Sequence, residues 1–536
     1  MKKIFVLMVV SVTASALCWG DNDKRSEGAF GLGSMIQTYC GAVKELEVSY
    51  VDTLDYEKLL KNSLGAMFKT LDPYTEFIPA SDNTDYLKRL RSGEYGGVGS
   101  VITLMDSLPY FSEVYKGMPA AKAGIKNGDR ILEIDGVNCD TKKISEVSEM
   151  LRGKQGTIIN IKVAREGVQK PLTFTFEREK IALPSVMYWA EVAPGIGYIR
   201  IDDFVDRTSY EFKNALAELV EKYAITSLII DLRSNGGGLV DQAISVASLF
   251  VPKGTKLVEM NGAHEEKTRE YKTMEAPLYE NMKLLFLVDG NTASSSEILS
   301  GALQDLDRAV VMGERTFGKG LVQNIAELPY NNFMKMTVAK YYLPSGRCVQ
   351  KKDSADRKSF WTKNHREVED GCGVTPDTLL DFPSTINIAD YLYIKSMYFK
   401  FATQYWSKNT APADIKDFKV TDEIYAEFCQ FVKDNKFTYK LESEKYLNSL
   451  KEMIKQEGYG DLTADIFRQM SDAIQPNVER DMQMFKDEII RNLETEMAKM
   501  PWYQWGEYEI FMRHDKWQQE AVKLIQNEKE FDKILK

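Results

Sequence analysis

Histidine is scarce in this chain. Among 536 residues only three histidines occur, at His264, His365 and His514. None lies near the serine-rich segment at 292–297, and none belongs to the His-Glu-x-x-His pattern of a zinc site. The sequence therefore gives no support to a histidine-based catalytic triad or to a metal site, and it predicts no cofactor.

Cysteine is also rare, and its spacing lacks the paired pattern of metal ligands. The six cysteines are Cys18, Cys40, Cys139, Cys348, Cys372 and Cys429. Removal of the first as part of a leader leaves an odd number, so at least one thiol is free and a disulfide framework is not expected. Cys348 and Cys372 bracket one polar segment and remain a candidate pair.

The chain has no excess of basic residues and, after residue 20, no run of eighteen apolar residues. Lysine and arginine number 69 against 79 aspartates and glutamates, for a net charge of −10. A general affinity for nucleic acid is therefore not expected. Hydrophobic residues at 44% and charged residues at 28% are typical of globular proteins, and the length predicts two to four domains.

Residues 1–20 predict a secretory signal peptide, because two lysines precede an apolar run and a group of small residues. Ala14-x-Ala16 suits cleavage. The protein is expected to be exported, to a periplasm or cell envelope. The Leu17-Cys18 pair leaves a lipid anchor at Cys18, and hence association with a membrane, as an alternative.

A serine-rich segment lies where a strand is predicted to end and a helix to begin. Residues 282–288 are predicted to form a buried strand, a Gly/Asn/Thr cluster follows, and residues 294–306 have helical spacing. Ser294 can therefore present its hydroxyl beside unpaired helix amides, which suits a nucleophile near an oxyanion. Ser294-x-x-Glu297 is also a capping box, which would use the same amides without catalysis.

A second segment places Lys319 between Gly318 and Gly320, directly before apolar residues. A lysine amine in a poorly solvated site can act as a base. Gly313-x-x-x-x-Gly318-Lys319 also matches half of a phosphate-binding loop. The next residue is Gly320 rather than serine or threonine, so the hydroxyl that would bind magnesium is missing.

The run Thr-Ala-Ser-Ser-Ser-Glu at 292–297 resembles the signature of the carboxyl-terminal processing (tail-specific) serine proteases, peptidase family S41. The resemblance extends to Asp-Leu-Arg-Ser-Asn-Gly-Gly-Gly at 231–238 and covers about residues 30–380. Thr292 and Ser295 depart from the family pattern, in which serine and alanine are usual. The resemblance implies these roles: Ser294 as nucleophile, Lys319 as base, Gln323 one helical turn later as the residue that orients the lysine, and Gly237 and Ser295 as donors to the oxyanion.

The run at 114–136, with 151–157 and the alternating strands 158–164 and 172–177, closely resembles a PDZ domain that ends near residue 178. A PDZ domain binds a protein's C-terminus by adding it as a strand to its own sheet edge. The glycine-rich loop before the first strand is expected to expose backbone N–H groups to the terminal carboxylate. This loop comprises Tyr95, Gly96, Gly97, Val98 and Gly99.

The predicted fold class is multidomain α+β. Its parts are a signal peptide at 1–20, an N-terminal helical region at 21–92, the PDZ domain at 93–178, an α/β serine-protease core at 179–384 and a C-terminal helical extension at 385–536. Apolar residues at helical spacing predict that the extension packs on the core or on a second subunit. We expect no chemistry from it.

Together these features predict an exported serine endopeptidase that cleaves proteins near or from their C-terminal tails through a Ser/Lys dyad. Its partners would be protein substrates with accessible C-terminal tails, with a homo-oligomer or an adaptor as further candidates. The alternative is a catalytically inactive PDZ scaffold that only binds peptides. Such a scaffold would not need Ser294, Lys319 and Gln323 together.

Overall fold

The structure is a computed structural model that describes residues 31–80, 94–263, 268–382 and 386–536. The chain divides into two compact units, residues 1–77 and 78–536, and each is described by itself. The predicted signal peptide and Cys18 lie outside the described residues. No helix within the described ranges is both long and apolar enough to cross a membrane.

The first unit is helical where the sequence predicts helices. Its elements are α1 (Leu32–Ser49), α2 (Tyr56–Lys69) and the start of the short strand β1 (Glu76–Ile78). The Asp55 side chain begins α2 by accepting a hydrogen bond of 3.0 Å from the Lys58 N–H. The Tyr39 hydroxyl lies 2.6 Å from the Ser63 hydroxyl, which joins the two helices.

An antiparallel sheet of order β3-β4-β5-β7-β8, with β6 paired to β5, forms the first part of the second unit. Ile159, Ile161 and Val163 alternate along β7 and are fully buried, as expected for a strand with one face on a core. The elements are β3 (Ser100–Met105), β4 (Leu108–Val114), α4 (Pro119–Ala123), β5 (Arg130–Ile134), β6 (Val137–Asn138), α5 (Ile144–Leu151), β7 (Ile158–Ala164) and β8 (Leu172–Glu177).

The glycine-rich segment before β3 is not the open loop that the sequence predicts. Residues 94–97 form the strand β2 (Glu94–Gly97), which pairs with β9 (Glu179–Ala182) and places Tyr95 opposite the buried Ile181. Pairing with a distant strand overrides the low strand preference of glycine. Only Val98 and Gly99 remain as a connection to β3.

A six-stranded sheet of order β10-β11-β12-β15-β16-β21 forms the core of the unit. β10 runs antiparallel to β11 and the other neighbours are parallel, which confirms the predicted α/β layer. Its elements are β10 (Tyr188–Ala193), β11 (Ile196–Arg200), α6 (Thr208–Tyr223), β12 (Ser227–Asp231), α7 (Val240–Ala247), β15 (Lys283–Val288), α8 (Ser295–Asp305), β16 (Val310–Gly313) and β21 (Thr378–Leu379).

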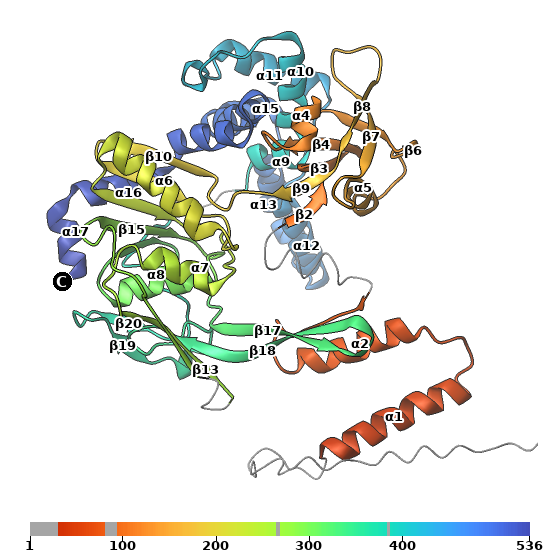
Figure 1. Ribbon diagram of the computed structural model, residues 1–536. Helices are drawn as coiled ribbons and strands as arrows, with labels where there is room; N and C mark the ends of the chain where they lie inside the picture. Colours follow the sequence, from red (N-terminus) through yellow and green to blue (C-terminus); the bar gives the residue numbers. More distant parts are fainter. Residues whose placement is uncertain (1–30, 81–93, 264–267, 383–385) are drawn as a thin grey trace, which may run out of the picture. The chain divides into compact units, whose positions relative to one another are not determined.

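Helices from different parts of the chain cover the two faces of this sheet (Figure 1). Ile230 and Phe286 point to the face covered by α6, α7 and α8. Ile229 and Leu285, one position away on the same strands, pack against residues of α15, α16 and α17 from the C-terminal extension. The extension therefore completes the core of the protease part.

A second, antiparallel sheet joins β17 to β18, β18 to β13 and β13 to β14. Its strands are β13 (Lys256–Gly262), β14 (Arg269–Lys272), β17 (Leu321–Leu328) and β18 (Asn332–Tyr342). A separate pair consists of β19 (Ser359–Trp361) and β20 (Glu367–Glu369), and single turns of 3-10 helix lie at η3 (Pro329–Asn331) and η4 (Ser354–Asp356).

The C-terminal extension is helical, as predicted. Its helices are α9 (Ile388–Ile394), α10 (Met397–Lys408), η5 (Ile415–Asp417), α11 (Asp422–Asp434), α12 (Glu442–Gln456), α13 (Gly460–Ile474), α14 (Val478–Met484), α15 (Lys486–His514), α16 (Lys516–Gln526) and α17 (Glu528–Leu535). Tyr503 interrupts α15 with a φ of 57°, two residues after Pro501. The stretch before this break packs in the extension's own core, and Met512, after it, packs on the core sheet.

Candidate active site

Ser294 lies between strand β15 and helix α8 in an unusual backbone conformation. Its φ is 57° and its ψ is −116°, although a side chain is present. Positive φ is uncommon for residues other than glycine, and it is found where the surrounding structure holds the chain in place. The Ser294 side chain is half-buried, whereas Ser295 and Ser296 are fully buried.

The two serines that follow use their hydroxyls within the protein. Ser295 Oγ donates to the Gly238 carbonyl at 2.7 Å, and Ser296 Oγ donates to the Asn235 carbonyl at 3.1 Å. These bonds attach the beginning of α8 to the glycine-rich turn at 231–238. Ser294 is therefore the one member of the serine run that has a partly accessible side chain.

Glu297 connects the two predicted catalytic segments. Its Oε2 accepts the Ser294 N–H at 2.9 Å and the Lys319 N–H at 2.8 Å. Its Oε1 accepts the Gly318 N–H at 2.8 Å and the Thr316 hydroxyl at 2.5 Å. One fully buried carboxylate thus holds the backbone of Ser294 next to the backbone of Lys319.

A capping box therefore accounts for only part of the hydrogen bonding of Glu297. Glu297 does accept the N–H of Ser294, as in a capping box, but it also binds the lysine loop. Burial raises the pKa of Glu297 above its ordinary value, while the hydrogen bonds from Thr316, Lys319, Ser294 and Gly318 lower it. Glu297 is not among the site residues that the sequence predicts, although the Ser-x-x-Glu spacing is a signal for it.

Lys319 lies in the loop between β16 and β17 and is half-buried. Its carbonyl accepts a hydrogen bond from the Tyr341 hydroxyl. Gly320 donates to Gln350 Oε1 at 3.0 Å, and a Cβ at Gly320 would lie 2.6 Å from the Gln350 nitrogen. The loop lies so close to the backbone of Gln350 that only glycine fits at position 320.

The structure corrects the expected surroundings of Gln323. The sequence interpretation placed it one helical turn after Lys319, but residues 321–328 form strand β17, with a bulge between Val322 and Gln323. Gln323 Nε2 donates to Thr337 Oγ1 on β18 at 3.4 Å. Its role toward Lys319 stays a prediction. Because the loop leads into a strand rather than a helix, it also lacks the context of a phosphate-binding loop.

The glycine-rich turn packs against Ser294. A Cβ at Gly237, whose φ is 101°, would lie 2.7 Å from Ser294 Cβ, so the site has no room for a side chain. The Asn235 carbonyl accepts the Ala293 N–H at 3.0 Å. In this conformation the Gly237 N–H donates to Asn235 Oδ1 at 2.8 Å, and its predicted donation to an oxyanion would replace that bond.

The edge of the PDZ sheet is open at β3. Within the described chain, β3 pairs with β4 on one side, and no strand pairs with its other side. Val98 O accepts the Ala120 N–H at 2.9 Å and Gly99 O accepts the Tyr115 N–H at 3.1 Å, which fixes the connection that enters β3. An edge strand with unpaired N–H and C=O groups suits strand addition by a peptide.

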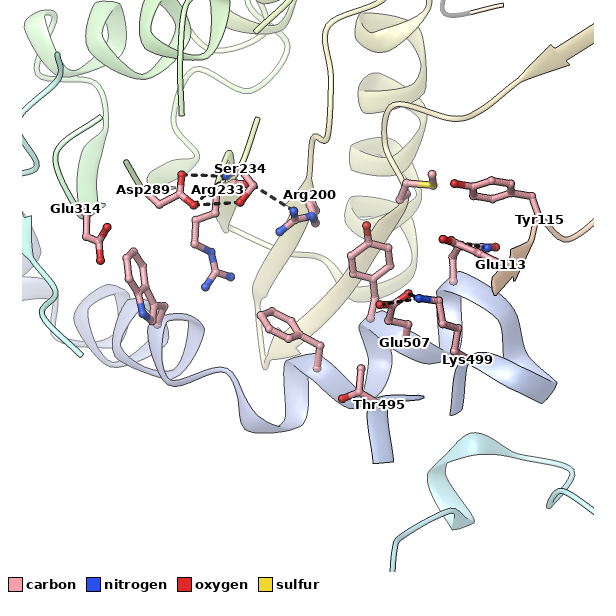
Figure 2. Close-up of a pocket in the computed structure, with 15 residues that line it drawn as sticks. Glu113, Tyr115, Arg200, Arg233, Ser234, Asp289, Glu314, Thr495, Lys499 and Glu507 are labelled. Atoms are coloured by element: carbon pink, nitrogen blue, oxygen red, sulfur yellow. Dashed lines mark hydrogen bonds and ion pairs between the residues drawn. The ribbon is translucent and has the colours of Figure 1, made fainter. Parts of the chain in front are cut away.

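A cavity of about 690 Å³ lies beside the site, where the PDZ part, the protease core and α15 meet. Figure 2 shows Arg233, Ser234 and Asp289 toward one end, and Glu113, Lys499 and Glu507 toward the other. Ser294 does not line this cavity, but Ser234 and Asp289, which do, belong to the turns next to Ser294. In the described residues, no group of three or more histidine, cysteine, aspartate or glutamate side chains could hold a metal ion.

Three family models match separate parts of the chain. The model of "Peptidase family S41" matches residues 195–379, that of a PDZ domain matches 110–165, and that of "Probable PDZ-protease, C-terminal helical domain" matches 388–525. A carboxy-terminal-processing protease of Bartonella bacilliformis is 33% identical over 343 residues, which cover 63% of this chain and 74% of the relative. The chain belongs to peptidase family S41.

Other S41 relatives have similar names. A probable CtpA-like serine protease of Staphylococcus epidermidis is 30% identical over 333 residues, which cover 62% of this chain and 66% of the relative. The solved photosystem II D1 C-terminal processing protease is 28% identical, with a TM-score of 0.37 and coverage of 64% of this chain and 86% of that one. The recognised family and the predicted fold class are confirmed, and this S41 peptidase is a serine protease.

Proposed function

We propose that this S41 peptidase cleaves proteins at their C-terminal tails through a Ser/Lys dyad of Ser294 and Lys319. The observation that carries the proposal is the shared carboxylate oxygen: Glu297 Oε2 accepts the backbone N–H of both residues. Two segments separated by helix α8 and strand β16 are thereby held together at their backbones. The strained conformation of Ser294 adds to this, because it presents the hydroxyl outside the regular helix.

The mechanism follows from these positions. A neutral Lys319 amine accepts the proton of the Ser294 hydroxyl as its oxygen attacks the scissile carbonyl. The oxyanion that forms receives hydrogen bonds from backbone N–H groups of Ser295 and Gly237. The lysine then gives the proton to the leaving amine, and water hydrolyses the acyl-enzyme. Gln323 orients the lysine from strand β17.

Labelling by a fluorophosphonate tests the nucleophile. Ser294→Ala should lose covalent labelling and turnover, and Ser300→Ala is the matched control, because that buried hydroxyl donates only to the Ser296 carbonyl of the same helix. Ser296→Ala should still be labelled. Loss of labelling in Ser296→Ala with retention in Ser294→Ala would show that the nucleophile is assigned to the wrong serine.

Substitution of the base tests the dyad. Lys319→Ala should abolish turnover, and Lys319→Arg should not restore it, because guanidinium stays protonated and cannot accept a proton. A folded Lys319→Ala variant with full activity would contradict the mechanism. An inactive scaffold, the alternative function, predicts instead that even the wild-type protein is not labelled at Ser294.

Substrate capture and export belong to the same proposal. A tail that binds as a strand along β3 would place its carboxylate at Val98 and Gly99, and the open edge of β3 supports this geometry. Export through residues 1–20 is supported by their sequence alone. Mass spectrometry of the mature N-terminus in an envelope fraction tests it: an acylated Cys18 would indicate a lipid anchor, and an unprocessed cytoplasmic chain would exclude export.

A further inference from the structure

Arg233, in the glycine-rich turn, is held from the C-terminal extension. Arg233 Nη1 donates to Asp515 Oδ1 at 3.1 Å, and Nη2 donates to Asp515 Oδ2, so the guanidinium and the carboxylate make a paired contact. The two residues are 282 positions apart in the sequence. Both are buried, with exposed fractions of 9% for Arg233 and 5% for Asp515.

Two aromatic rings of the extension enclose the same guanidinium. The Phe511 and Trp517 ring centroids lie 5.7 and 5.5 Å from the Arg233 Cζ, within the range of a cation–π contact. In Figure 2 the Arg233 side chain points away from Ser234 and Asp289, toward the C-terminal helices. Arg233 also binds Asp231 within its own turn.

Asp515 is itself held in place by the helix it begins. It stands between α15 and α16 as the N-cap of α16, and its Oδ1 accepts the Trp517 N–H at 3.0 Å. α15 and α16 pack on the core sheet through Met512 and Ala521. The carboxylate therefore has a fixed position relative to the sheet from which the glycine-rich turn leaves.

The residues after Arg233 connect it to the nucleophile. Ser234, with a φ of 63°, donates its N–H to Asp289 Oδ1 at 2.9 Å, in the turn that leads to Ser294. The next residue accepts the Ala293 N–H through its carbonyl. The two residues after Arg233 are thus hydrogen-bonded to the turn that carries the Ser294 hydroxyl.

We propose that Asp515 is a positioning residue for catalysis, which acts through Arg233 to hold the glycine-rich turn against Ser294. The inference rests on the proposed Ser/Lys function. It gives the C-terminal extension a part in the chemistry, whereas the sequence assigned it none. A displacement of about 1 Å at a reacting group can lower a rate by about 10²-fold, so a loosened turn is expected to slow acylation.

The test is Asp515→Asn, which removes the charge but keeps an oxygen that can cap α16. The control is Asp414→Asn, the same change at an exposed N-cap of η5, where the carboxylate accepts the Lys416 N–H at 2.9 Å and contacts no part of the glycine-rich turn. Two quantities are measured in the full-length protein: the rate constant of fluorophosphonate labelling at Ser294, and the Kd of a peptide with a free C-terminus.

We expect Asp515→Asn to slow labelling by about 10-fold to 10²-fold with an unchanged peptide Kd, and Asp414→Asn to stay within twofold of wild type on both measures. If Asp515 affected stability alone, Asp515→Asn would lower the melting temperature without slowing labelling at an unchanged peptide Kd. A folded Asp515→Asn protein that is labelled at the wild-type rate overturns the inference. Absence of labelling in the wild type would instead overturn the proposed function.

A second variant covers the case in which Asp515→Asn does not fold. Phe511→Leu keeps the helix and an apolar side chain but removes one ring from the guanidinium. It should slow labelling several-fold with unchanged peptide binding. A wild-type rate in this variant would also overturn the inference.

Discussion

Substitution of Glu297 by glutamine would test whether one buried carboxylate holds the active site together. Glutamine keeps the size of the side chain but has a single acceptor oxygen, whereas the carboxylate accepts four hydrogen bonds. In the better orientation its oxygen still accepts the N–H groups of Ser294 and Lys319. Its NH2 group then faces the Gly318 N–H and the Thr316 hydroxyl.

The size of the effect follows from the bonds that are lost. The Thr316 hydroxyl already accepts the Val374 N–H at 2.7 Å and can also accept from the new NH2 group. Gly318 is buried and its N–H loses the carboxylate oxygen that accepts it, which costs about 1–3 kcal/mol. The hydrogen bonds from the Ser294 and Lys319 N–H groups remain, but they become weaker because glutamine carries no negative charge. We expect Glu297→Gln to lower the free energy of unfolding by about 3 kcal/mol in total.

Alanine is the less informative change at this position. It would leave all four donors without a partner at about 1–3 kcal/mol each, a sum comparable with the roughly 5–15 kcal/mol that stabilises a whole domain. Such a variant would unfold, and the loss of activity would then say nothing about geometry.

Urea unfolding and the rate of fluorophosphonate labelling should be measured on the same samples. Glu297→Gln should be labelled about 10²-fold more slowly than wild type while still folded, because the lysine loop shifts relative to Ser294. Glu327→Gln, the same change at an exposed position on β17, is the control and should change the unfolding free energy by less than about 0.5 kcal/mol. Wild-type stability together with wild-type labelling in Glu297→Gln would refute the argument.

Two further predictions concern pH and tail binding. Burial raises the pKa of Glu496 from 4.5 to about 7, Lys499 opposes the shift, and Glu507 and Glu113 add to it. Between these two pH values the folded state keeps a proton that the unfolded state releases. The contribution of Glu496 to the free energy of unfolding is therefore fully present below pH 4.5 and is lost as the pH rises to about 7. The loss is at most roughly 3 kcal/mol. Glu496→Gln should flatten the unfolding free energy over that window in urea titrations, and an unchanged slope would contradict the assignment. Amidation of a peptide's C-terminus should weaken its binding to an inactive variant several-fold, because the N–H groups around Val98 lose a charged acceptor. Fluorescence polarisation measures the two affinities. Equal affinities would exclude Val98 and Gly99 as the site of the carboxylate.

The strands and helices that carry the site were predictable because their patterns are local. Residues 284–288 form a continuous apolar run, as a parallel strand buried on both faces requires, and the structure has β15 at Lys283–Val288. The helical spacing after Ser294 corresponds to α8, which is buried along its whole length. The extension's helices likewise follow their own apolar spacing.

The two local errors have a common origin. The glycines at 96 and 97 favoured a loop, but β2 pairs with β9, a strand about 80 residues later in the chain. Gln323 was counted along a helix, but residues 321–328 pair with β18. In both cases the pairing partner decides the conformation, and a single stretch of sequence does not contain that partner.

The sequence by itself determined the family, the order of the parts and the candidate residues Ser294 and Lys319, because these depend on residue types at short, characteristic spacings. The tertiary structure decided how the candidates meet. Glu297 reaches the Lys319 N–H across 22 positions, and Asp515 reaches Arg233 across 282. A buried carboxylate needs donors around it, and which donors surround it depends on how distant segments pack, which no local pattern records.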